Sequence, residues 1–148
     1  MKRQVFISLF TVLLLSFCKS SQEGHSKKIS ILKIEMHLSA HGVESDNFPS
    51  IDAFVDFTKG SSNCAKSYYN TAFKGSSYKL SNEEINKILL LLQSSDLYKL
   101  KKEYKVSKTD QPTSTLIIYS NQQIFTIKDY GLEGDYPLQN LYKTIYKL

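Results

Sequence analysis

The segment from residue 80 to 92, LSNEEINKILLLL, carries the strongest helix signal in the chain. Ser81 and Glu84 have the S-x-x-E spacing of a capping box, in which each side chain binds a free backbone N–H of the first turn. Apolar residues then recur at i, i+3, i+4 and i+7, on one helix face: Ile85, Ile88, Leu89 and Leu92. Such a face needs a large apolar partner, and the β-rich segments on either side are the candidates to supply it.

Alternating apolar and polar residues predict strands on both sides of this helix. Before it, the pattern covers 29–38 and 51–58, and the Tyr-rich segment 64–73 is typical of a third strand, paired with the second in a hairpin. After it, 115–119 and 123–130 are separated by Ser-Asn-Gln and predict a second hairpin.

A second helix is expected at the C-terminus. Pro137 suits the first helical turn, and Leu138, Leu141, Tyr142 and Ile145 repeat the spacing of the first helix. The order of elements is β-ββ-α-ββ-α, with connections short enough for antiparallel pairing. We therefore predict a two-layer α+β fold, an antiparallel sheet of about five strands with two helices packed on one face.

The N-terminus has the features of a secretory signal peptide. Lys2 and Arg3 precede an apolar run over 5–15 that is too short to span a bilayer as a stable helix. The run ends in Leu15-Ser16-Phe17-Cys18, which resembles a bacterial lipobox, where the chain is cut before a Cys that is then acylated. Phe17 replaces the small residue that is usual before this Cys. An ordinary signal peptide that happens to carry a Cys is the alternative.

These features predict the organisation of the chain. Residues 1–17 are a lipoprotein signal peptide, 18–28 are the lipidated Cys18 with a flexible polar tether, and 29–148 are a single α+β domain. The predicted location is the bacterial cell envelope, with Cys18 in a membrane. Lys19 follows the Cys, where Asp often signals retention in the inner membrane, and this favours the outer membrane.

The basic charge does not predict a nucleic-acid partner. The chain has 19 Lys and Arg residues against 14 Asp and Glu residues, but Arg3 is the only Arg and lies in the signal peptide. The mature protein would then lack the guanidinium group that binds guanine or phosphate in a bidentate manner. We interpret the lysines as scattered over solvated faces and expect no nucleic-acid partner.

No motif predicts a metal site or a cofactor. His37 and His41 are four residues apart, but one ends a predicted strand and the other lies in a loop, and two ligands do not make a site. The chain has no nucleophile elbow and no glycine-rich phosphate loop. Cys64 is left unpaired if Cys18 carries lipid, and we interpret it as a buried hydrophobic residue rather than a reactive thiol.

Carboxylates give the alternative hypothesis of a small hydrolase. Asp52 and Asp56 share one face of a predicted strand, as paired catalytic acids can. The loop 129–135, DYGLEGD, offers more carboxylates but does not have the spacing of the twelve-residue calcium loop. Loop solubility and helix capping explain the acids of this loop more simply.

Tyrosine is the unusual residue of the composition. All ten Tyr residues lie between Tyr68 and Tyr146. A Tyr side chain combines an apolar ring with a polar hydroxyl, which suits glycan and protein surfaces. Tyr68 and Tyr69 are adjacent in the predicted third strand and would point to opposite faces, so we name them as candidate binding residues. Strand propensity and core edges are the competing explanation.

A set of motifs after residue 75 suggests a family. They are Ser81-Asn82-Glu83-Glu84, Leu97-Tyr98-Lys99-Leu100, Tyr104, Asp110-Gln111-Pro112, the hairpin 116–127, and Tyr136-Pro137-Leu138 with Leu141 and Ile145. Together they resemble a domain of unknown function found in small bacterial envelope lipoproteins. Members carry a Cys-Pro segment where this chain has Asn47-Phe48-Pro49, so the Cys is replaced by Phe48. The resemblance implies a lipidated envelope protein and no assigned activity.

These observations favour a non-enzymatic, lipid-anchored envelope module. It would bind a protein or a glycan through the sheet face that the helices leave free, and a periplasmic inhibitor of lysozyme or of a protease is a special case. The alternatives are the carboxylate-dependent hydrolase and a structural subunit of an envelope assembly.

Overall fold

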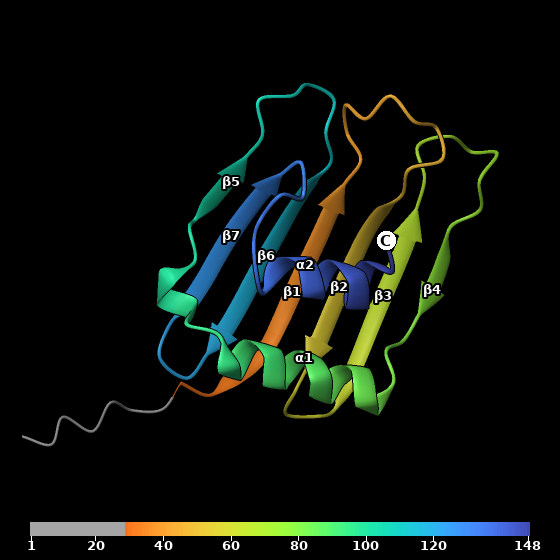
Figure 1. Ribbon diagram of the computed structural model, residues 1–148. Helices are drawn as coiled ribbons and strands as arrows, with labels where there is room; N and C mark the ends of the chain where they lie inside the picture. Colours follow the sequence, from red (N-terminus) through yellow and green to blue (C-terminus); the bar gives the residue numbers. More distant parts are fainter. Residues whose placement is uncertain (1–28) are drawn as a thin grey trace, which may run out of the picture.

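The computed structural model describes residues 29–148 (Figure 1). The predicted signal peptide 1–17, the predicted lipidation site Cys18 and the predicted tether 18–28 lie outside the described residues. Within the described part of the chain, no helix is both long enough and apolar enough to cross a membrane.

Seven strands form one sheet in the order β4-β3-β2-β1-β6-β7-β5. Neighbouring strands pair antiparallel, except that β5 runs parallel to β7. The strands are β1 (Ile31–Ser39), β2 (Ser50–Asp56), β3 (Ser61–Ser67), β4 (Ser76–Tyr78), β5 (Glu103–Lys105), β6 (Thr113–Ser120) and β7 (Ile124–Tyr130). The helical segments are α1 (Asn82–Ser94), the 3₁₀ turn η1 (Leu97–Lys99), α2 (Leu138–Leu141) and the π-helical turn η2 (Tyr142–Tyr146).

The α+β fold is confirmed, but the predicted architecture is wrong. The antiparallel sheet of about five strands that the sequence predicted is not found; over the described residues the sheet is mixed, has seven strands and makes up most of the domain, and the two helices are short. The two missed strands, β4 and β5, have three residues each, too few to show an alternating pattern. The parallel pairing of β5 with β7 is a non-local contact that no local pattern predicts.

The third strand also differs from the prediction. It covers Ser61–Ser67, and residues 68–75 form a loop, whereas the sequence predicted a strand over 64–73. The side chain of Asn70 accepts a hydrogen bond from the N–H of Ala72 (2.9 Å), and its carbonyl accepts one from the N–H of Phe73 (3.1 Å). Asn favours such local turns over strand pairing, so the Tyr-rich segment leaves the sheet.

The capping box at the start of α1 is confirmed. The Ser81 hydroxyl accepts a hydrogen bond from the N–H of Glu84 (3.2 Å), and the Glu84 carboxylate accepts one from the N–H of Ser81 (2.7 Å). The latter bond holds the pKa of Glu84 below its usual value, and Lys147, 3.3 Å away, adds to this effect. The C-terminal residues are thereby tied to the start of α1.

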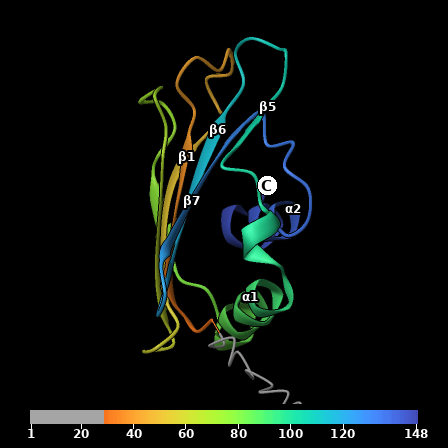
Figure 2. The ribbon, with the colours of Figure 1, turned by 90° about the vertical axis from the view of Figure 1, so that its left-hand side faces the viewer.

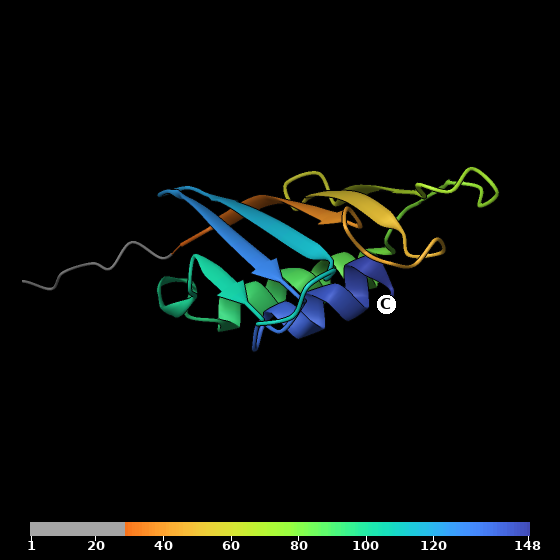
Figure 3. The ribbon, with the colours of Figure 1, turned by 90° about the horizontal axis from the view of Figure 1, so that it is seen from above.

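The two faces of the sheet differ in composition. Figures 2 and 3 show α1 and α2 on one side of the sheet, which we call the inner face, while the opposite side, the outer face, is open. The alternation along β1 is clear: Ile34, Met36 and Leu38 are buried on the inner face, and Glu35 and His37 lie on the outer face. The helices bury their apolar side chains against the inner face, among them Ile88, Leu92, Leu138, Leu141 and Ile145.

A buried carboxylate connects the last strand to the C-terminal helical segment. Asp129 is only 1% exposed, and its oxygens accept hydrogen bonds from the N–H of Glu133 (3.1 Å), the N–H of Gly134 (2.8 Å) and the hydroxyl of Tyr142 (2.7 Å). Burial raises the pKa of Tyr142, and the hydrogen bond to Asp129 adds to this increase. The Asp129 carboxylate thus closes the loop after β7 and positions η2.

We expect Asp129→Asn to destabilise the fold strongly. An amide in place of the carboxylate turns one N–H···O bond into a contact between two donors, which should cost about 2 kcal/mol or more in the free energy of unfolding. Tyr142→Phe removes a single bond and should cost less, about 1 kcal/mol. Urea unfolding followed by circular dichroism measures both changes.

Asp135→Asn is the matched control, since Asp135 is an exposed acid in the same loop with no side-chain hydrogen bond to another described residue. We expect it to change the free energy of unfolding by less than about 0.5 kcal/mol. Equal effects of the Asp129 and Asp135 substitutions would show that the buried carboxylate does not stabilise this fold.

Cys64 lies on the inner face of β3 and is 0% exposed. Burial raises the pKa of its thiol, and a hydrogen bond with Tyr78 opposes this increase. The structure therefore places a protonated, covered thiol at this position, which fits the interpretation of a buried hydrophobic residue.

We expect iodoacetamide at pH 8 to leave Cys64 unmodified in the folded protein and to modify it readily in urea, because only unfolding exposes the sulfur and returns its pKa to the ordinary range. Mass spectrometry of the Cys64 peptide measures the two rates. Similar rates in the folded and the unfolded protein would contradict the buried thiol.

Candidate functional site

A cavity lies at one end of the sheet, between the β1–β2 loop (40–49) and the β3–β4 loop (68–75). Figure 1 shows both loops at the end of the sheet opposite the start of β1, where the chain enters the domain. We call this space the loop cavity; its volume is about 540 Å³. It is lined by Ser39, Ala40, His41, Gly42, Val43, Ser45, Asp46, Phe48, Ser50, Ser67, Tyr68 and Tyr69.

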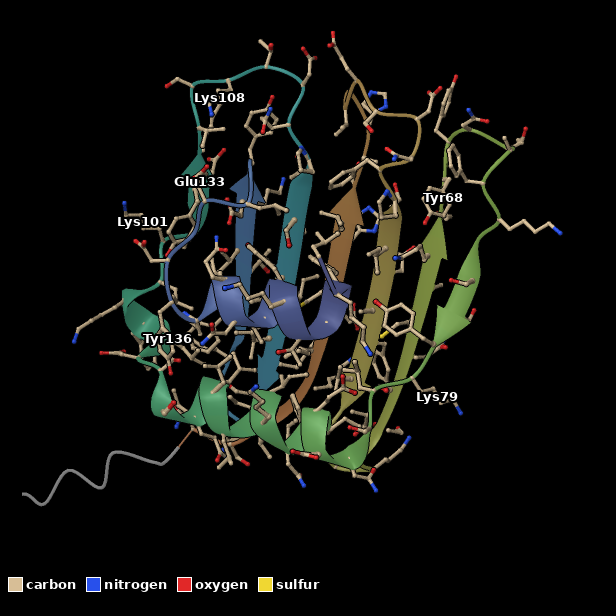
Figure 4. All side chains as sticks on the ribbon, turned by 45° about the vertical axis from the view of Figure 1, so that its right-hand side comes forward. Tyr68, Lys79, Lys101, Lys108, Glu133 and Tyr136 are labelled. Atoms are coloured by element: carbon tan, nitrogen blue, oxygen red, sulfur yellow. The ribbon has the colours of Figure 1, made fainter. Side chains whose placement is uncertain are left out.

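The two candidate binding residues both line the loop cavity. Tyr68 (labelled in Figure 4) is half-buried, and its ring centroid lies 5.5 Å from that of Phe73 in the same loop. Tyr69 is 96% exposed. They do not occupy opposite faces of a strand, because β3 ends at Ser67. Instead, both residues belong to the β3–β4 loop that borders the cavity, Tyr68 with a half-buried ring and Tyr69 with a side chain in solvent.

Hydrogen bonds hold the walls of the loop cavity together. The side-chain amide of Asn70 donates to the Asp46 carboxylate (3.3 Å), which joins the β3–β4 loop to the β1–β2 loop. The Ser50 hydroxyl accepts a hydrogen bond from the N–H of Ala40 (3.2 Å), and the carbonyl of Ala40 accepts one from the N–H of Val43 (3.0 Å). The cavity is therefore bounded by two loops that contact each other.

His37 and His41, which were weighed as metal ligands because of their spacing, lie in different parts of the structure. His41 lines the loop cavity, while His37 lies on the outer face with its Nδ1 atom 2.5 Å from the Asp52 carboxylate. Over residues 29–148, no group of three or more His, Cys, Asp or Glu side chains has an arrangement that could hold a metal ion.

The acidic residues of the hydrolase hypothesis do not meet. Asp52 lies on the outer face beside His37, and Asp129 is buried on the inner face. Asp56 accepts hydrogen bonds within the turn after β2, and the bond from the Thr58 hydroxyl is the main cause of its lowered pKa. Asp135 is exposed in the loop after β7. These carboxylates do not share a cleft.

A second cleft, missed by the sequence analysis, lies beside β5. We call it the lysine cleft; its volume is about 500 Å³, and it is lined by Glu103, Tyr104, Lys105, Val106, Ser107, Lys108, Thr109, Thr113, Lys128 and Tyr130. The parallel pairing of β5 with β7 sets Glu103 opposite Lys128 and Lys105 opposite Tyr130. Because Lys105 and Lys128 are distant in sequence, no local motif predicts that they line the same cleft. The sequence analysis therefore interpreted the lysines as scattered over the surface.

Comparison with protein-family models gives a family match. Neither the curated proteins nor the solved structures contain a match to this chain. The family match covers residues 52–148, from β2 to the C-terminus, and so includes the β3–β4 loop and the whole lysine cleft but excludes β1. Since it covers more than half of the chain, the chain belongs to the family described as Domain of unknown function (DUF6438).

Proposed function

We propose that this protein is a non-enzymatic binding module of the bacterial cell envelope, anchored through lipidated Cys18, that binds a glycan in the loop cavity. The observation that carries the proposal is the cavity itself, in which Tyr68 and Tyr69 stand beside polar side chains from a second loop. Ligand sites are concave and combine apolar or aromatic surface with a few polar groups, as this cavity does.

The side chains around the cavity suit a sugar. A tyrosine ring offers an apolar face to the C–H groups of a pyranose and a hydroxyl for hydrogen bonding. Hydroxyl groups of Ser45 and Ser67 and the carboxylate of Asp46 lie in the same lining and can exchange hydrogen bonds with sugar hydroxyls. A bound sugar would cover the ring of Tyr69, which is 96% exposed in the free protein.

The position of the cavity fits an anchored receptor. β1 begins at Ile31, beside the tether, and its nine residues reach the other end of the sheet, about 30 Å away at about 3.3 Å per residue (Figure 1). A chain held at Cys18 would therefore present the cavity away from the membrane. This geometry supports a role in contacting envelope material at a distance from the lipid surface.

A concave site also distinguishes between the hypotheses for the partner. A flat face would suit a folded protein, including the target of a periplasmic inhibitor. A cavity of this size suits a short segment of a glycan. The hydrolase alternative has no support from the described residues, because Asp52, Asp56 and Asp129 do not share a cleft.

We expect Tyr68→Ala and Tyr69→Ala each to weaken glycan binding by about tenfold, or about 1.4 kcal/mol, because each removes one aromatic ring that a bound sugar would contact. An array of bacterial envelope glycans, probed with the mature chain carrying Cys18→Ser, identifies the ligand, and calorimetry measures the affinity of each variant.

The matched control is Tyr98→Ala, because Tyr98 is 61% exposed and lies outside the loop cavity. It should bind the glycan like the parent chain. Unchanged affinity in both cavity variants would remove the loop cavity as the binding site.

Lipid anchoring has its own test. We expect cells that express the full chain to incorporate a clickable fatty acid into the protein, and Cys18→Ser to abolish this incorporation, because the lipobox thiol is the predicted acceptor. In-gel fluorescence measures the label. Equal labelling of both forms would show that Cys18 is not the site of acylation, whatever the loop cavity binds.

A further inference from the structure

The lysine cleft is lined by several positively charged side chains, whereas the loop cavity has no lysine in its lining. Its lining contributes the ammonium groups of Lys105, Lys108 and Lys128 against the single carboxylate of Glu103. Among the described residues, no Asp or Glu oxygen lies within 4 Å of these three ammonium groups, although other lysines of the domain form such pairs. Three lysines without a partner around one cleft leave a net positive site.

The lysines come from two segments of the chain, the end of β5 with the loop that follows it, and the strand β7. Lys105 ends β5, Lys108 lies in the β5–β6 loop, and Lys128 lies in the middle of β7. Figure 4 shows Lys108 at the end of the sheet that carries the loops. Lys105 and Lys108 belong to the lysine-rich segment 101–108, and the parallel pairing of β5 with β7 brings Lys128 beside this segment, so the fold completes the cleft.

The loop that forms the wall of the cleft is held to β7 by hydrogen bonds. The N–H of Val106 donates to the Tyr130 carbonyl (3.2 Å), the N–H of Gln111 donates to the Tyr130 hydroxyl (3.3 Å), and the Gly131 N–H donates to the Pro112 carbonyl (2.9 Å). Gly131 has φ +99°, and a Cβ atom at this position would clash with the Val106 side chain. The shape of the cleft is therefore largely set before a ligand arrives.

Uncharged groups in the lining complete an anion site. The side chains of Ser107, Thr109 and Thr113 carry hydroxyls that can donate hydrogen bonds to an oxyanion, and Tyr130 contributes a half-buried ring. Ammonium groups act as point charges towards carboxylate, sulfate or phosphate without requiring the planar geometry that Arg prefers. The absence of Arg from the described domain is thus compatible with anion binding.

From these observations we propose that the lysine cleft binds an anionic glycan through the carboxylate or phosphate groups of its sugars. The inference goes beyond the proposed function, because it concerns a second site, and it rests on that function in one respect, that the partner is a glycan. Figure 1 shows the β5–β6 loop at the end of the sheet away from the start of β1. A bilayer that holds the tether would lie at the other end, so a lipid headgroup is disfavoured as the ligand.

The experiment compares two triple variants of the mature chain with Cys18→Ser. One carries Lys105→Gln, Lys108→Gln and Lys128→Gln; the control carries Lys79→Gln, Lys87→Gln and Lys143→Gln, three exposed lysines outside the cleft. Both lose the same net charge, so only the position of the charge differs. The probe is polygalacturonic acid, with neutral dextran as its uncharged counterpart, and calorimetry measures affinity at low and high salt.

We expect the cleft variant to bind polygalacturonic acid at least about tenfold more weakly than the parent, the control variant to bind like the parent, and added salt to weaken parent binding, because it screens exposed charges. Equal losses in the two variants would overturn the proposal, since net charge alone would then explain binding. No loss in the cleft variant would overturn it as well.

Two further arms separate the possible failures. Vesicles rich in anionic phospholipid test the headgroup; vesicle binding that depends on the same three lysines would assign the cleft to a lipid and overturn the glycan proposal. The Tyr68→Ala chain should keep its affinity for polygalacturonic acid, since Tyr68 lies outside the lysine cleft. If the substitutions in the loop cavity do not change glycan binding, the measurement with polygalacturonic acid still tests the lysine cleft.

Discussion

The pairing of β1 on both of its sides is the constraint on which the rest of the structure depends. β1 pairs with β2 and β6, strands that are more than fifty residues apart in the chain, and so joins the two halves of the sheet. Its inner residues Ile34 and Leu38 are fully buried. A slip of one residue in this register would turn those side chains to the outer face. The same strand sets the distance between the start of the described domain and the loop cavity.

Buried polar groups on the inner face then fix the positions of the loop after β7 and of the C-terminal segment, which strand pairing does not determine. Asp129 satisfies the N–H groups of the loop after β7, and the Tyr146 hydroxyl pairs with Ser114 of β6 at 2.8 Å. A buried network of this kind is stabilising only when each member has a partner, and no buried side-chain N or O atom of the described residues lacks one. The network holds β7 beneath the C-terminal segment, and β7 in turn supports the lysine cleft.

Features formed by residues close in sequence could be predicted, whereas contacts between distant segments could not. The capping box of Ser81 and Glu84 and the hairpin of β6 and β7 are encoded by neighbouring residues, and both are confirmed. β4 and β5 are too short to show an alternating pattern of apolar and polar residues. β5 pairs in parallel with β7, although β6 lies between them in the sequence. Tyr68 and Tyr69 were named as candidates for their residue type, but their shared cavity depends on where β3 ends. Lys105 and Lys128 meet only through the sheet.

The central claim is that the loop end of the sheet, away from the tether, is the part of the molecule that meets the ligand. The most direct measurement is a titration of the ¹⁵N-labelled mature chain with the glycan that the array identifies, followed by amide chemical shifts. We expect the shifts that change to belong to the loops 40–49 and 68–75, with those of 105–113 added when the glycan is anionic. Changes confined to α1, or to the turns beside the start of β1, would contradict it.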